Sequence, residues 1–588
     1  MNADDAPPGP GLPGAKPSEA PVAQDRLPDS SSLSPLSRRS FLARGVVTAA
    51  MGSLAASGLM DPAEAPADDL GPQTPNRRVN EAYAIRHRAA LLQRRLKAQP
   101  HPTNGDEELY PRRIANFSKG FPHDAFGEVD PAAYDAFLNA LRSGRPEDFE
   151  ALPMGAISPA TQRKFVNPQS AYAFDLEGAD SHALAIPPAP AFNSLEQTGE
   201  IVENYWMALL RDVPFEDYDT HTLAQAAMDD LSALTDFRGP KINGQVTAQT
   251  LFRDALPGTN VGPLISQFLW LPVPFGANYI EQRMRTPVPG VDYLTQFPQW
   301  LSAQRGEVPT QGLTFDSQRR YIRNGRDLSQ WVHIDVLFQA YFHALLIMLA
   351  GPDAGDFNSS GLGVPFDPAN PYATSRTQDG FGTFGGPHIA TLMCEVSTRA
   401  LKAVWFQKWC VHRRLRPEVY AARIHNQFRG LRDYPLQTDE LLHTQVISEL
   451  SNRYGGYLLP LAFPEGSPLH PSYGAGHATV AGACITILKA WFPESYIIPN
   501  PVVASPDGLS LLPYSGPPLT IGGELNKLAS NVATGRNMAG VHWRSDANES
   551  YKLGEAIAIS VLRDQHLTYN EHFDGFTLTK FDGTQIVI

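Results

Sequence analysis

The helix-forming segments of this chain are separated by long connections rich in proline and glycine. Proline removes a backbone donor and disrupts the interior of a helix or sheet, so the 52 prolines are expected mainly in loops. Alternating strand patterns are scarce and short, at 519–521 and 585–588. The pattern predicts an all-α fold of helical bundles with long loops and minor short strands. Apolar residues recur at helical spacing over 200–210, 330–349, 389–409, 475–491 and 546–566.

Composition indicates a large, well-packed protein that binds small anions. The chain has 588 residues, of which 42% are hydrophobic and 19% are charged, and this excludes general disorder. Its net charge is −13, and an acidic chain that gathers basic residues in one place is expected to bind no nucleic acid. After residue 67 no apolar run reaches the ~18 residues that span a membrane, so no membrane partner is expected. Three cysteines in apolar helical patterns, without metal-ligand spacing, are predicted to be buried thiols: Cys394, Cys410 and Cys484.

The start of the chain has the features of an export signal. Residues 1–36 are rich in Pro, Ser, Ala and Asp and are expected to be disordered. Residues 37–42, Ser-Arg-Arg-Ser-Phe-Leu, precede a mildly apolar run at 46–60, which is the pattern of a twin-arginine signal. Ala65-Pro66-Ala67 fits a small-residue cleavage site, and the mature protein is expected to be periplasmic or secreted. The predicted parts are a disordered leader with a signal peptide at 1–67 and a helical body at 68–588, with its active-site part at about 380–570.

The motif His470-Pro-Ser-Tyr-Gly-Ala-Gly-His477 lies immediately before an apolar helical segment. Its glycines favour a turn, and backbone N–H groups near Gly476, at the start of the helix, would point together toward an anion. A histidine stands at each end of the motif, and histidine is the side chain best suited to move protons near neutral pH. The motif therefore predicts an oxyanion site with proton-transfer groups beside it.

Two further clusters supply the other groups that an oxyanion site needs. Arginine forks match tetrahedral oxyanions with paired hydrogen bonds, and lysine adds a point charge. A histidine and an aspartate four residues apart would share a helix face, where the carboxylate fixes the ring tautomer. The first cluster, before Pro417, consists of Lys408, Arg413, Arg414 and Arg416. The second consists of Arg536, His542 and Asp546.

Each of these segments also has a purely structural interpretation. A glycine-rich turn before a helix usually only connects two elements. A helix from about 389 to 413 would end near Arg416, because Pro417 disfavours helix before it, and would project its last side chains into solvent. His542 and Asp546 would form a satisfied structural pair. A structural account needs three separate coincidences, so one functional site is the favoured interpretation.

The order Lys…Arg-Pro, Gly-His and Arg…His-x-x-x-Asp resembles the vanadate-dependent haloperoxidases and the acid phosphatases that share their anion site. The phosphatases usually have Lys-x6-Arg-Pro, Pro-Ser-Gly-His and Ser-Arg-x5-His-x3-Asp. This chain departs from all three, with seven residues between Lys408 and Arg416, an insertion at 473–475, and Gly535 before Arg536. Beyond about the first hundred residues it looks like the bromoperoxidases of red algae and their bacterial relatives. The similar segments are Gly380-Phe-Gly-Thr-Phe-Gly-Gly-Pro-His388, Arg399-Ala-Leu-Lys-Ala-Val404, Ala462-Phe-Pro-Glu-Gly-Ser-Pro468, Ala481-Gly-Ala-Cys-Ile-Thr-Ile-Leu-Lys-Ala490, Gly523-Glu-Leu-Asn-Lys-Leu-Ala529 and Lys580-Phe-Asp-Gly-Thr584.

The resemblance implies a role for each matching residue. His542 matches the histidine that bonds vanadium, and Asp546 stands behind it. His477 matches the acid/base histidine, and His470 matches a second histidine of the bromoperoxidases, where fungal chloroperoxidases carry phenylalanine. Lys408 would also polarise the bound peroxide. The groups that match the holders of the vanadate oxygens are Lys408, Arg416, Arg536 and the Gly476 N–H.

Two positions depart from the family pattern. The serine expected before the glycine, whose hydroxyl bonds a vanadate oxygen, is Ala475 here. Such a bond is worth ~1–3 kcal/mol, so weaker cofactor binding is expected. Three residues before Lys408, algal bromoperoxidases have arginine, whereas this chain has Trp405, as fungal chloroperoxidases do. The indole would line the halide pocket, exclude water and offer its N–H as a donor. The alternative is that it is an aromatic residue of the core.

The resemblance implies a vanadate-dependent haloperoxidase that uses hydrogen peroxide to oxidise bromide, together with iodide and chloride, to hypohalous acid that halogenates organic acceptors. It further implies vanadate as cofactor, a structural calcium with unassigned ligands, and homo-oligomers assembled from dimers, up to a dodecamer. Two alternatives stay open. An acid phosphatase would use His542 as nucleophile and His477 as leaving-group acid. A non-enzymatic oxyanion-binding or shell protein is favoured only by Ala475.

Overall fold

The computed structural model describes residues 74–97, 99–351 and 361–588, so the predicted signal peptide lies outside the described residues. The chain forms two units, 1–81 and 82–588. Helix α2 (Pro75–Arg95) begins in the first unit, and the second contains all the residues predicted to form the site.

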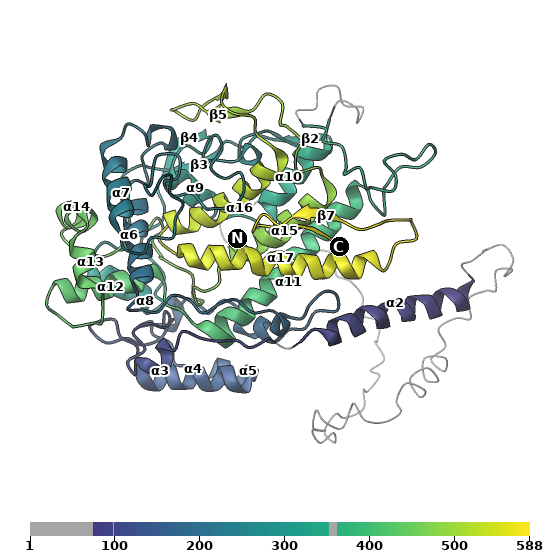
Figure 1. The fold of residues 1–588 in the computed structure, drawn as a ribbon. Helices are drawn as coiled ribbons and strands as arrows, with labels where there is room; N and C mark the ends of the chain where they lie inside the picture. The colour runs from purple at the N-terminus through teal and green to yellow at the C-terminus, as the bar shows by residue number, and fades with distance from the viewer. Residues whose placement is uncertain (1–73, 98, 352–360) are drawn as a thin grey trace, which may run out of the picture. The chain divides into compact units, whose positions relative to one another are not determined.

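Helices dominate the second unit, which confirms the predicted fold class (Figure 1). The shorter or outer helices are α3 (Asp106–Leu109), α4 (Pro131–Ser143), α5 (Pro146–Glu150), α7 (Thr222–Ala233), α8 (Phe297–Gln304), α13 (Thr438–Leu442) and α14 (Gln445–Tyr454). The helices that contribute to the site or its support are α6 (Leu195–Leu209), α9 (Gly325–Trp331), α10 (Gln339–Leu349), α11 (Gly386–Phe406), α12 (Pro417–Phe428), α15 (Gly476–Trp491), α16 (Ile521–Met538) and α17 (Arg544–His566). Single 3-10 turns lie at Pro159–Thr161, Pro168–Tyr172, Ser181–Ala183, Phe215–Asp217 and Gln267–Leu269.

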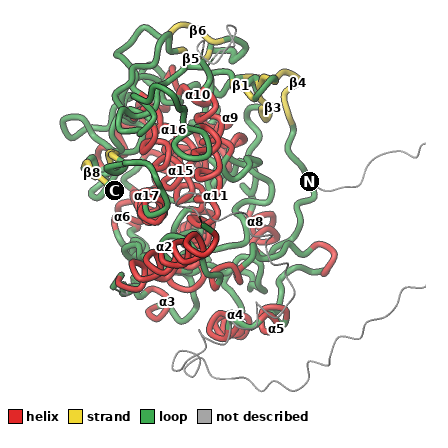
Figure 2. The backbone as a smooth tube through the Cα atoms, turned by 90° about the vertical axis from the view of Figure 1, so that its right-hand side faces the viewer, coloured by secondary structure: helices red, strands yellow, loops and turns green. Residues whose placement is uncertain are grey.

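Helix α15 is the central helix of the second unit. It packs most extensively against α17, and then against α11 and α16, so that three helices surround it (Figures 1 and 2). Every residue of α15 except His477 is buried. A helix that is apolar on all sides requires this position in the core, because no face of it gains from contact with water.

Glycines allow α15 and α17 to approach each other closely. A Cβ atom on Gly482 of α15 would overlap the carbonyl oxygen of Tyr551, and one on Gly554 of α17 would overlap the carbonyl oxygen of Thr479. The two backbones therefore meet where both helices lack side chains. This contact places the N-terminal ends of the two helices, which carry His477 and Asp546, beside each other.

The predicted helix over 330–349 is wrong, because two helices and a loop occupy this stretch. Helix α9 ends at Trp331, α10 begins at Gln339, and the connection contains Asp335. The apolar residues of the loop fit the helical spacing although they are not buried. Ile334 is 74% exposed and Val336 is 58% exposed, so they face solvent and do not continue a buried helix face. The interruption has a functional consequence, since the loop contributes Asp335 to the site.

The segment 389–413 also ends differently from the prediction. Helix α11 passes into a π-helical turn, η8 (Gln407–His412), and Arg413 leaves it with a left-handed φ of 42°. A π-turn accommodates one residue more than an α-turn. Lys408 lies within this turn, and Arg416 follows it as the residue before α12.

Short antiparallel ribbons make up the sheet structure of the described residues. The predicted strand at 585–588 is confirmed as β8, whereas 519–521 forms only a bridge between Thr520 and Ile497 before α16 begins. The four pairs are β1 (Val273–Phe275) with β2 (Asn278–Ile280), β3 (Met284–Pro287) with β4 (Phe315–Arg320), β5 (Val502–Ala504) with β6 (Leu511–Pro513), and β7 (Thr577–Thr579) with β8 (Gln585–Val587).

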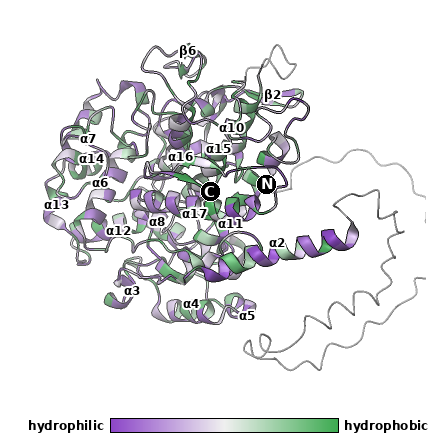
Figure 3. Cartoon of the chain, turned by 45° about the vertical axis from the view of Figure 1, so that its right-hand side comes forward, coloured by the Kyte–Doolittle hydropathy of each residue, from purple (hydrophilic) through white to green (hydrophobic). Residues whose placement is uncertain are grey.

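Polar and apolar residues are mixed along the outer helices, such as α7 and α14 (Figure 3). This is expected of helices that bury one face against a core. Within the described ranges, no helix is long and apolar enough to cross a membrane.

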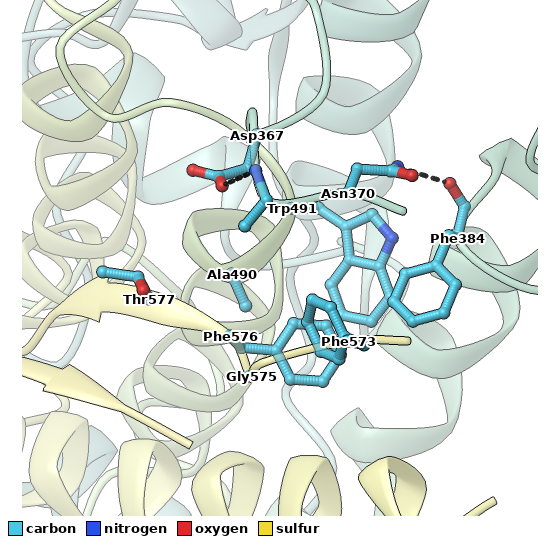
Figure 4. A pocket seen from close by; sticks show the side chains of 10 residues that line it. Asp367, Asn370, Phe384, Ala490, Trp491, Phe573, Gly575, Phe576 and Thr577 are labelled. Carbon is cyan, nitrogen blue, oxygen red and sulfur yellow. Dashed lines mark hydrogen bonds between the residues drawn. The ribbon is translucent and has the colours of Figure 1, made fainter. Parts of the chain in front are cut away.

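An aromatic cluster closes the C-terminal end of α15 (Figure 4). Trp491 stacks on Phe576 at 4.7 Å between ring centroids, and Phe384 lies 4.8 Å from Phe573. The loop before α11 is tied to this cluster, because the Asp367 backbone N–H donates to the Trp491 carbonyl and the Asn370 amide to the Phe384 carbonyl. The end of α15 opposite His477 is thereby fixed.

The three cysteines form no disulfide. Cys484, in α15, is buried as predicted. The prediction is wrong for Cys394 in α11 and Cys410 in the following turn, which are only partly buried, because neither is on the buried side of its helix.

Candidate active site

A cavity of about 300 Å³ lies at the N-terminal end of α15. It combines apolar walls with histidines, an arginine and an aspartate, and it joins Trp405, which precedes the first cluster, to residues of the 470–477 motif and of the second cluster. Its lining consists of Val166, Asp335, Leu337, Tyr341, Leu401, Trp405, His470, Gly476, His477, Val480, Arg536 and His542.

Gly476 is the first residue of α15 and faces the indole of Trp405. A Cβ atom at this position would lie 3.2 Å from a carbon of the Trp405 ring, closer than side chains normally pack. The absence of a side chain lets the start of the helix, with its unpaired N–H groups and positive dipole end, border the cavity. The geometry agrees with the anion site predicted from the sequence.

Lys408 lies in the π-turn and is completely buried. Its Nζ donates hydrogen bonds to the carbonyl oxygens of Pro471 (2.8 Å) and Ser472 (2.7 Å). An ammonium group has three hydrogens, so one remains for another acceptor. Lys408 thus supports the loop before α15 and still has a donor for an anion.

Arg416 holds the same loop and also reaches the second cluster. Its guanidinium donates to the His470 carbonyl at 3.0 Å and to the Val541 carbonyl at 2.6 Å. One Nη lies 2.9 Å from Nε2 of His542, and the other lies 2.9 Å from Nδ1 of His470. The prediction that side chains at this helix end project into solvent is therefore wrong, because Arg416 turns inward and joins two histidines.

Arg536 lies on α16, on another side of the cavity. One Nη donates to the Val332 carbonyl at 2.9 Å, and the guanidinium lies over the ring of Phe463. Its Nε is buried and has no hydrogen-bond partner in the described structure. A buried guanidinium N–H without an acceptor is costly, and an oxygen of a bound anion would satisfy it.

The three cations raise the electrostatic potential of the site. Among the described residues, none of Lys408, Arg416 and Arg536 forms an ion pair with a carboxylate. Burial, and then the charge of Arg416, lowers the pKa of Lys408 well below its usual value. Burial also lowers the pKa of Arg416 to about 9 and lowers that of Arg536. An anion held between these groups would restore the charged forms, so the residues present fit an oxyanion.

His542 has one ring nitrogen committed to an acceptor and the other available as a ligand. Nδ1 lies 2.8 Å from the Asp546 carboxylate, which can only accept, and Nε2 faces the Arg416 guanidinium, which can only donate. The ring is therefore the neutral tautomer with the proton on Nδ1. Burial, with the charges of Arg416 and Lys408, lowers the pKa of His542 well below its usual value. A neutral imidazole whose unprotonated Nε2 accepts only from Arg416 can offer that lone pair to a metal instead.

Asp546 is buried behind His542. His542 precedes α17, so the two residues meet through the helix cap and not, as predicted, along one helix face. The carboxylate accepts from His542 Nδ1, from Ser472 Oγ at 2.5 Å, and from the Trp543 backbone N–H at 3.2 Å. The last contact is that of an acid in the first helical turn, which satisfies a donor at the helix start.

His477 is paired with a residue that the sequence analysis missed. Its Nε2 lies 3.1 Å from Oδ1 of Asp335 in the loop between α9 and α10. No hydrogen bond joins Nδ1 to another described residue, so this nitrogen is the one available for proton transfer. The sequence signal for Asp335 was an aspartate within an apolar run, which is also common on the exposed side of a helix.

The rings of His470 and Trp405 contact each other at an interplanar angle of 39° in the wall of the cavity. Their ring centroids are 4.9 Å apart, and Nζ of Lys408 lies 5.8 Å from the Trp405 ring. Burial, and then the charges of Lys408 and Arg416, lowers the pKa of His470 well below its usual value, so this ring is neutral. The prediction that the Trp405 N–H is offered as a donor to the pocket is wrong, because it donates to the Val166 carbonyl at 3.0 Å. Trp405 is thus an apolar wall.

Two predicted cluster members lie outside the cavity. Arg413 pairs with Glu107 across the protein, and Arg414 pairs with Asp546 and Glu200. Ala475 is the residue before α15, and its backbone N–H donates to Ser550 Oγ at 2.8 Å. Identical side chains in one short segment thus have different partners, and of the first cluster only the side chains of Lys408 and Arg416 bond to the backbone carbonyls of the loop before α15.

Together these features define the class: a helical-bundle protein with a candidate oxyanion site of three buried cations and a neutral histidine. Residues 392–571 match the family model described as the VCPO second helical-bundle domain. The chain is 38% identical over 613 residues to the vanadium-dependent bromoperoxidases of Corallina pilulifera and Corallina officinalis, with 89% of this chain and 100% of each relative covered. The chain belongs to the vanadium-dependent bromoperoxidase family.

A solved relative supports this assignment over nearly the whole fold. The homohexameric structure of the second vanadate-dependent bromoperoxidase from Ascophyllum nodosum superimposes with a TM-score of 0.82 at 31% identity, covering 90% of this chain and 93% of that one. A vanadium-dependent bromoperoxidase of the same organism is 35% identical over 527 residues, 86% of this chain and 91% of its own length.

Proposed function

We propose that this protein is a vanadate-dependent haloperoxidase that uses hydrogen peroxide to oxidise bromide to hypobromous acid, which halogenates organic acceptors. The observation that carries the proposal is the set of three buried cations without carboxylate partners around the unprotonated Nε2 of His542, which accepts only from Arg416. Such an arrangement favours a metal oxyanion over a bare cation. When bound, vanadate would supply Lewis-acid activation of peroxide toward halide.

The residues of this chain would bind the cofactor and move protons. His542 Nε2 would be the metal ligand, and the oxyanion oxygens would accept from Lys408, Arg416, Arg536 and the Gly476 N–H. His477 would hold or release a proton at Nδ1, with its ring oriented by Asp335 at Nε2. His470 is neutral and lines the cavity, and because its Nδ1 accepts from Arg416, its Nε2–H would donate to an oxyanion oxygen without adding a fourth positive charge.

The decisive experiment compares two activities of the purified protein. After addition of orthovanadate, we expect peroxide-dependent bromination of a phenolic dye, and without vanadate we expect little hydrolysis of p-nitrophenyl phosphate. Rapid phosphate ester hydrolysis without bromination would indicate the phosphatase alternative. Absence of both activities with vanadate still bound would indicate an oxyanion-binding protein.

Lys408 is expected to make vanadate binding dependent on pH. Its pKa is lowered by burial and by Arg416 in the free protein, and a bound oxyanion would raise it again. Binding should therefore take up protons between these two pKa values, and affinity should fall as the pH rises through the lower one. Calorimetric titration with vanadate in two buffers of different ionisation enthalpy measures the uptake. Lys408→Gln lacks the titrating group, so equal uptake in both proteins would contradict the assignment.

Replacing Ala475 by serine is expected to tighten vanadate binding. The hydroxyl would stand next to Gly476 and supply the hydrogen bond that the alanine cannot, worth ~1 kcal/mol or about fivefold in the dissociation constant. Serine would also cap α15 and raise the melting temperature. Equilibrium dialysis and thermal unfolding separate the two effects. A higher melting temperature with an unchanged dissociation constant would show that the hydroxyl only caps the helix.

We further propose that the protein is exported and forms homo-oligomers. The twin arginines, Arg38 and Arg39, support export, and retention of an Arg38→Lys/Arg39→Lys variant in the cytoplasm would test it by cell fractionation. The homohexameric relative supports assembly, which native mass spectrometry would measure. Within the described ranges, no group of three or more His, Cys, Asp or Glu side chains is placed to hold a metal ion, so we assign no calcium ligands. Elemental analysis of the purified protein would test for calcium.

A further inference from the structure

In the sequence, Arg414 lies between Lys408 and Arg416, two residues of the candidate site, but its side chain is directed away from the cavity. It is buried, with only 3% of its surface exposed, and its side chain bridges three parts of the chain. One Nη donates to Asp546 Oδ1 at 2.8 Å and to Ser545 Oγ at 2.8 Å. The other donates to Glu200 Oε2 and Gln197 Oε1, each at 2.7 Å. A lysine at this position could not make these paired contacts.

The contacts of Arg414 extend to the loop before α15 as well. Its backbone carbonyl accepts from the Ser472 N–H at 3.0 Å, and its guanidinium lies 4.9 Å from the Trp543 ring and 5.9 Å from the Tyr473 ring. Ser472 in turn donates to Asp546. Arg414 therefore contacts each of the three segments that form the site.

The negative charge on Asp546 determines which ring nitrogen of His542 carries the proton. Asp546 Oδ1 is taken by Arg414, which leaves Oδ2 to accept from His542 Nδ1. A carboxylate in a dry interior without a cation would tend to take a proton itself, and then it could no longer accept reliably from Nδ1. The carboxylate of Glu200 places a second negative charge beside Arg414. It also accepts a hydrogen bond from the Ser545 N–H at the start of α17.

We propose that Arg414 is a positioning residue for the vanadate ligand: by holding Asp546 as an oriented carboxylate, it keeps His542 in the Nδ1–H tautomer with the Nε2 lone pair facing the anion. The inference rests on the proposed vanadate site. In this arrangement Glu200 of α6 holds Arg414, Arg414 orients Asp546, and Asp546 orients the ring of His542. Arg414 does not touch the anion.

The test uses three variants of the full-length apo protein. Arg414→Gln removes the charge, Arg414→Lys keeps the charge without the fork, and Arg413→Gln is the matched control. Arg413 is the neighbouring arginine, is also largely buried and paired with a carboxylate, but contacts Glu107 and not Asp546. Melting temperature and circular dichroism show which variants fold.

Two readouts separate positioning from a merely structural role. The first is vanadate affinity, measured by equilibrium dialysis and elemental analysis. The second is the ring nitrogen chemical shifts of ¹⁵N-histidine-labelled apo protein, which report the tautomer of His542 independently of vanadate. We expect Arg414→Gln to weaken vanadate binding by about 10- to 100-fold and to lose the Nδ1–H signature, as changes behind a metal ligand do. Arg414→Lys should be intermediate, and Arg413→Gln should match the wild type in both readouts.

The outcomes distinguish this inference from the proposed function. If the wild-type protein fails to bind vanadate, the proposed function fails while the tautomer readout still tests Arg414. If the wild type binds vanadate but folded Arg414 variants keep its affinity within about threefold and keep the Nδ1–H tautomer, the positioning role is wrong. If Arg414→Gln does not fold, Arg414→Lys decides by the same two measurements.

Discussion

His542→Ala is expected to abolish peroxide-dependent bromination, because it removes the proposed direct bond from the protein to vanadium. The buried cations would still attract the oxyanion, so we expect weak residual vanadate binding with the affinity reduced by at least about 100-fold. Elemental analysis of dialysed protein measures retention, and the dye assay measures activity. Full activity with stoichiometric vanadium in this variant would overturn the assignment of the ligand.

The control for this variant must separate loss of a ligand from loss of the fold. The substitution also removes one of the donors to the buried Asp546, so some destabilisation is expected. His443→Ala changes an exposed histidine outside the cavity and should keep both activity and stability. If His542→Ala melts far below the His443→Ala protein, vanadate binding by the folded fraction is the deciding measurement.

Trp405→Arg is expected to remove chlorination selectively while largely preserving bromination. The indole lies beside Lys408 and His470 in a buried wall, where it keeps water and further charge away. A guanidinium there would add a fourth cation within ~6 Å of Lys408, a repulsion of about 3 kcal/mol at an effective dielectric constant of about 20. It would also bring water into the cavity. Chloride is harder to oxidise than bromide, so its oxidation should respond most to the weaker activation of peroxide.

Because the indole N–H is bound to the Val166 carbonyl, a second substitution tests the mechanism. Trp405→Phe loses this hydrogen bond and the part of the indole that faces Gly476, but it keeps an apolar ring and adds no charge, so it should retain most of the chlorination. Rates of chloride and bromide oxidation are compared in fully vanadate-loaded proteins from about pH 4 to about pH 8. If the native protein oxidises bromide but no chloride over this range, Trp405 is a packing residue only.

The local features of the sequence predicted most of the helices and the segments that form the site. Helix α15 was predicted almost to the residue, because it is buried on all sides and starts at a glycine-rich turn. The start of α17 was predicted to within two residues and its end at His566. Helix α11, in contrast, ends earlier than predicted and passes into a π-turn that the apolar pattern did not indicate. Basic residues and histidines near these ends indicated an oxyanion site before any distance was known.

Side-chain direction and partner choice depended on the tertiary structure. Sequence could not distinguish Arg413, Arg414 and Arg416, because their partners Glu107, Glu200 and His542 are far away along the chain. Nor could it predict the partner of the indole N–H at position 405.

Asp335 shows the same limit most clearly. Apolar residues at helical spacing normally indicate a buried helix face. Ile334 and Val336 have this spacing although both face solvent, so the pattern predicted a helix where the structure has a loop. Its carboxylate meets His477 only because α10 and α15 pack together and α9 ends where it does. The sequence by itself determined which chemical groups this protein has near one helix start. The packing of helices distant in the chain decided which of those groups face the anion, because hydrogen bonds and charges act over a few ångströms in space, whatever the separation in sequence.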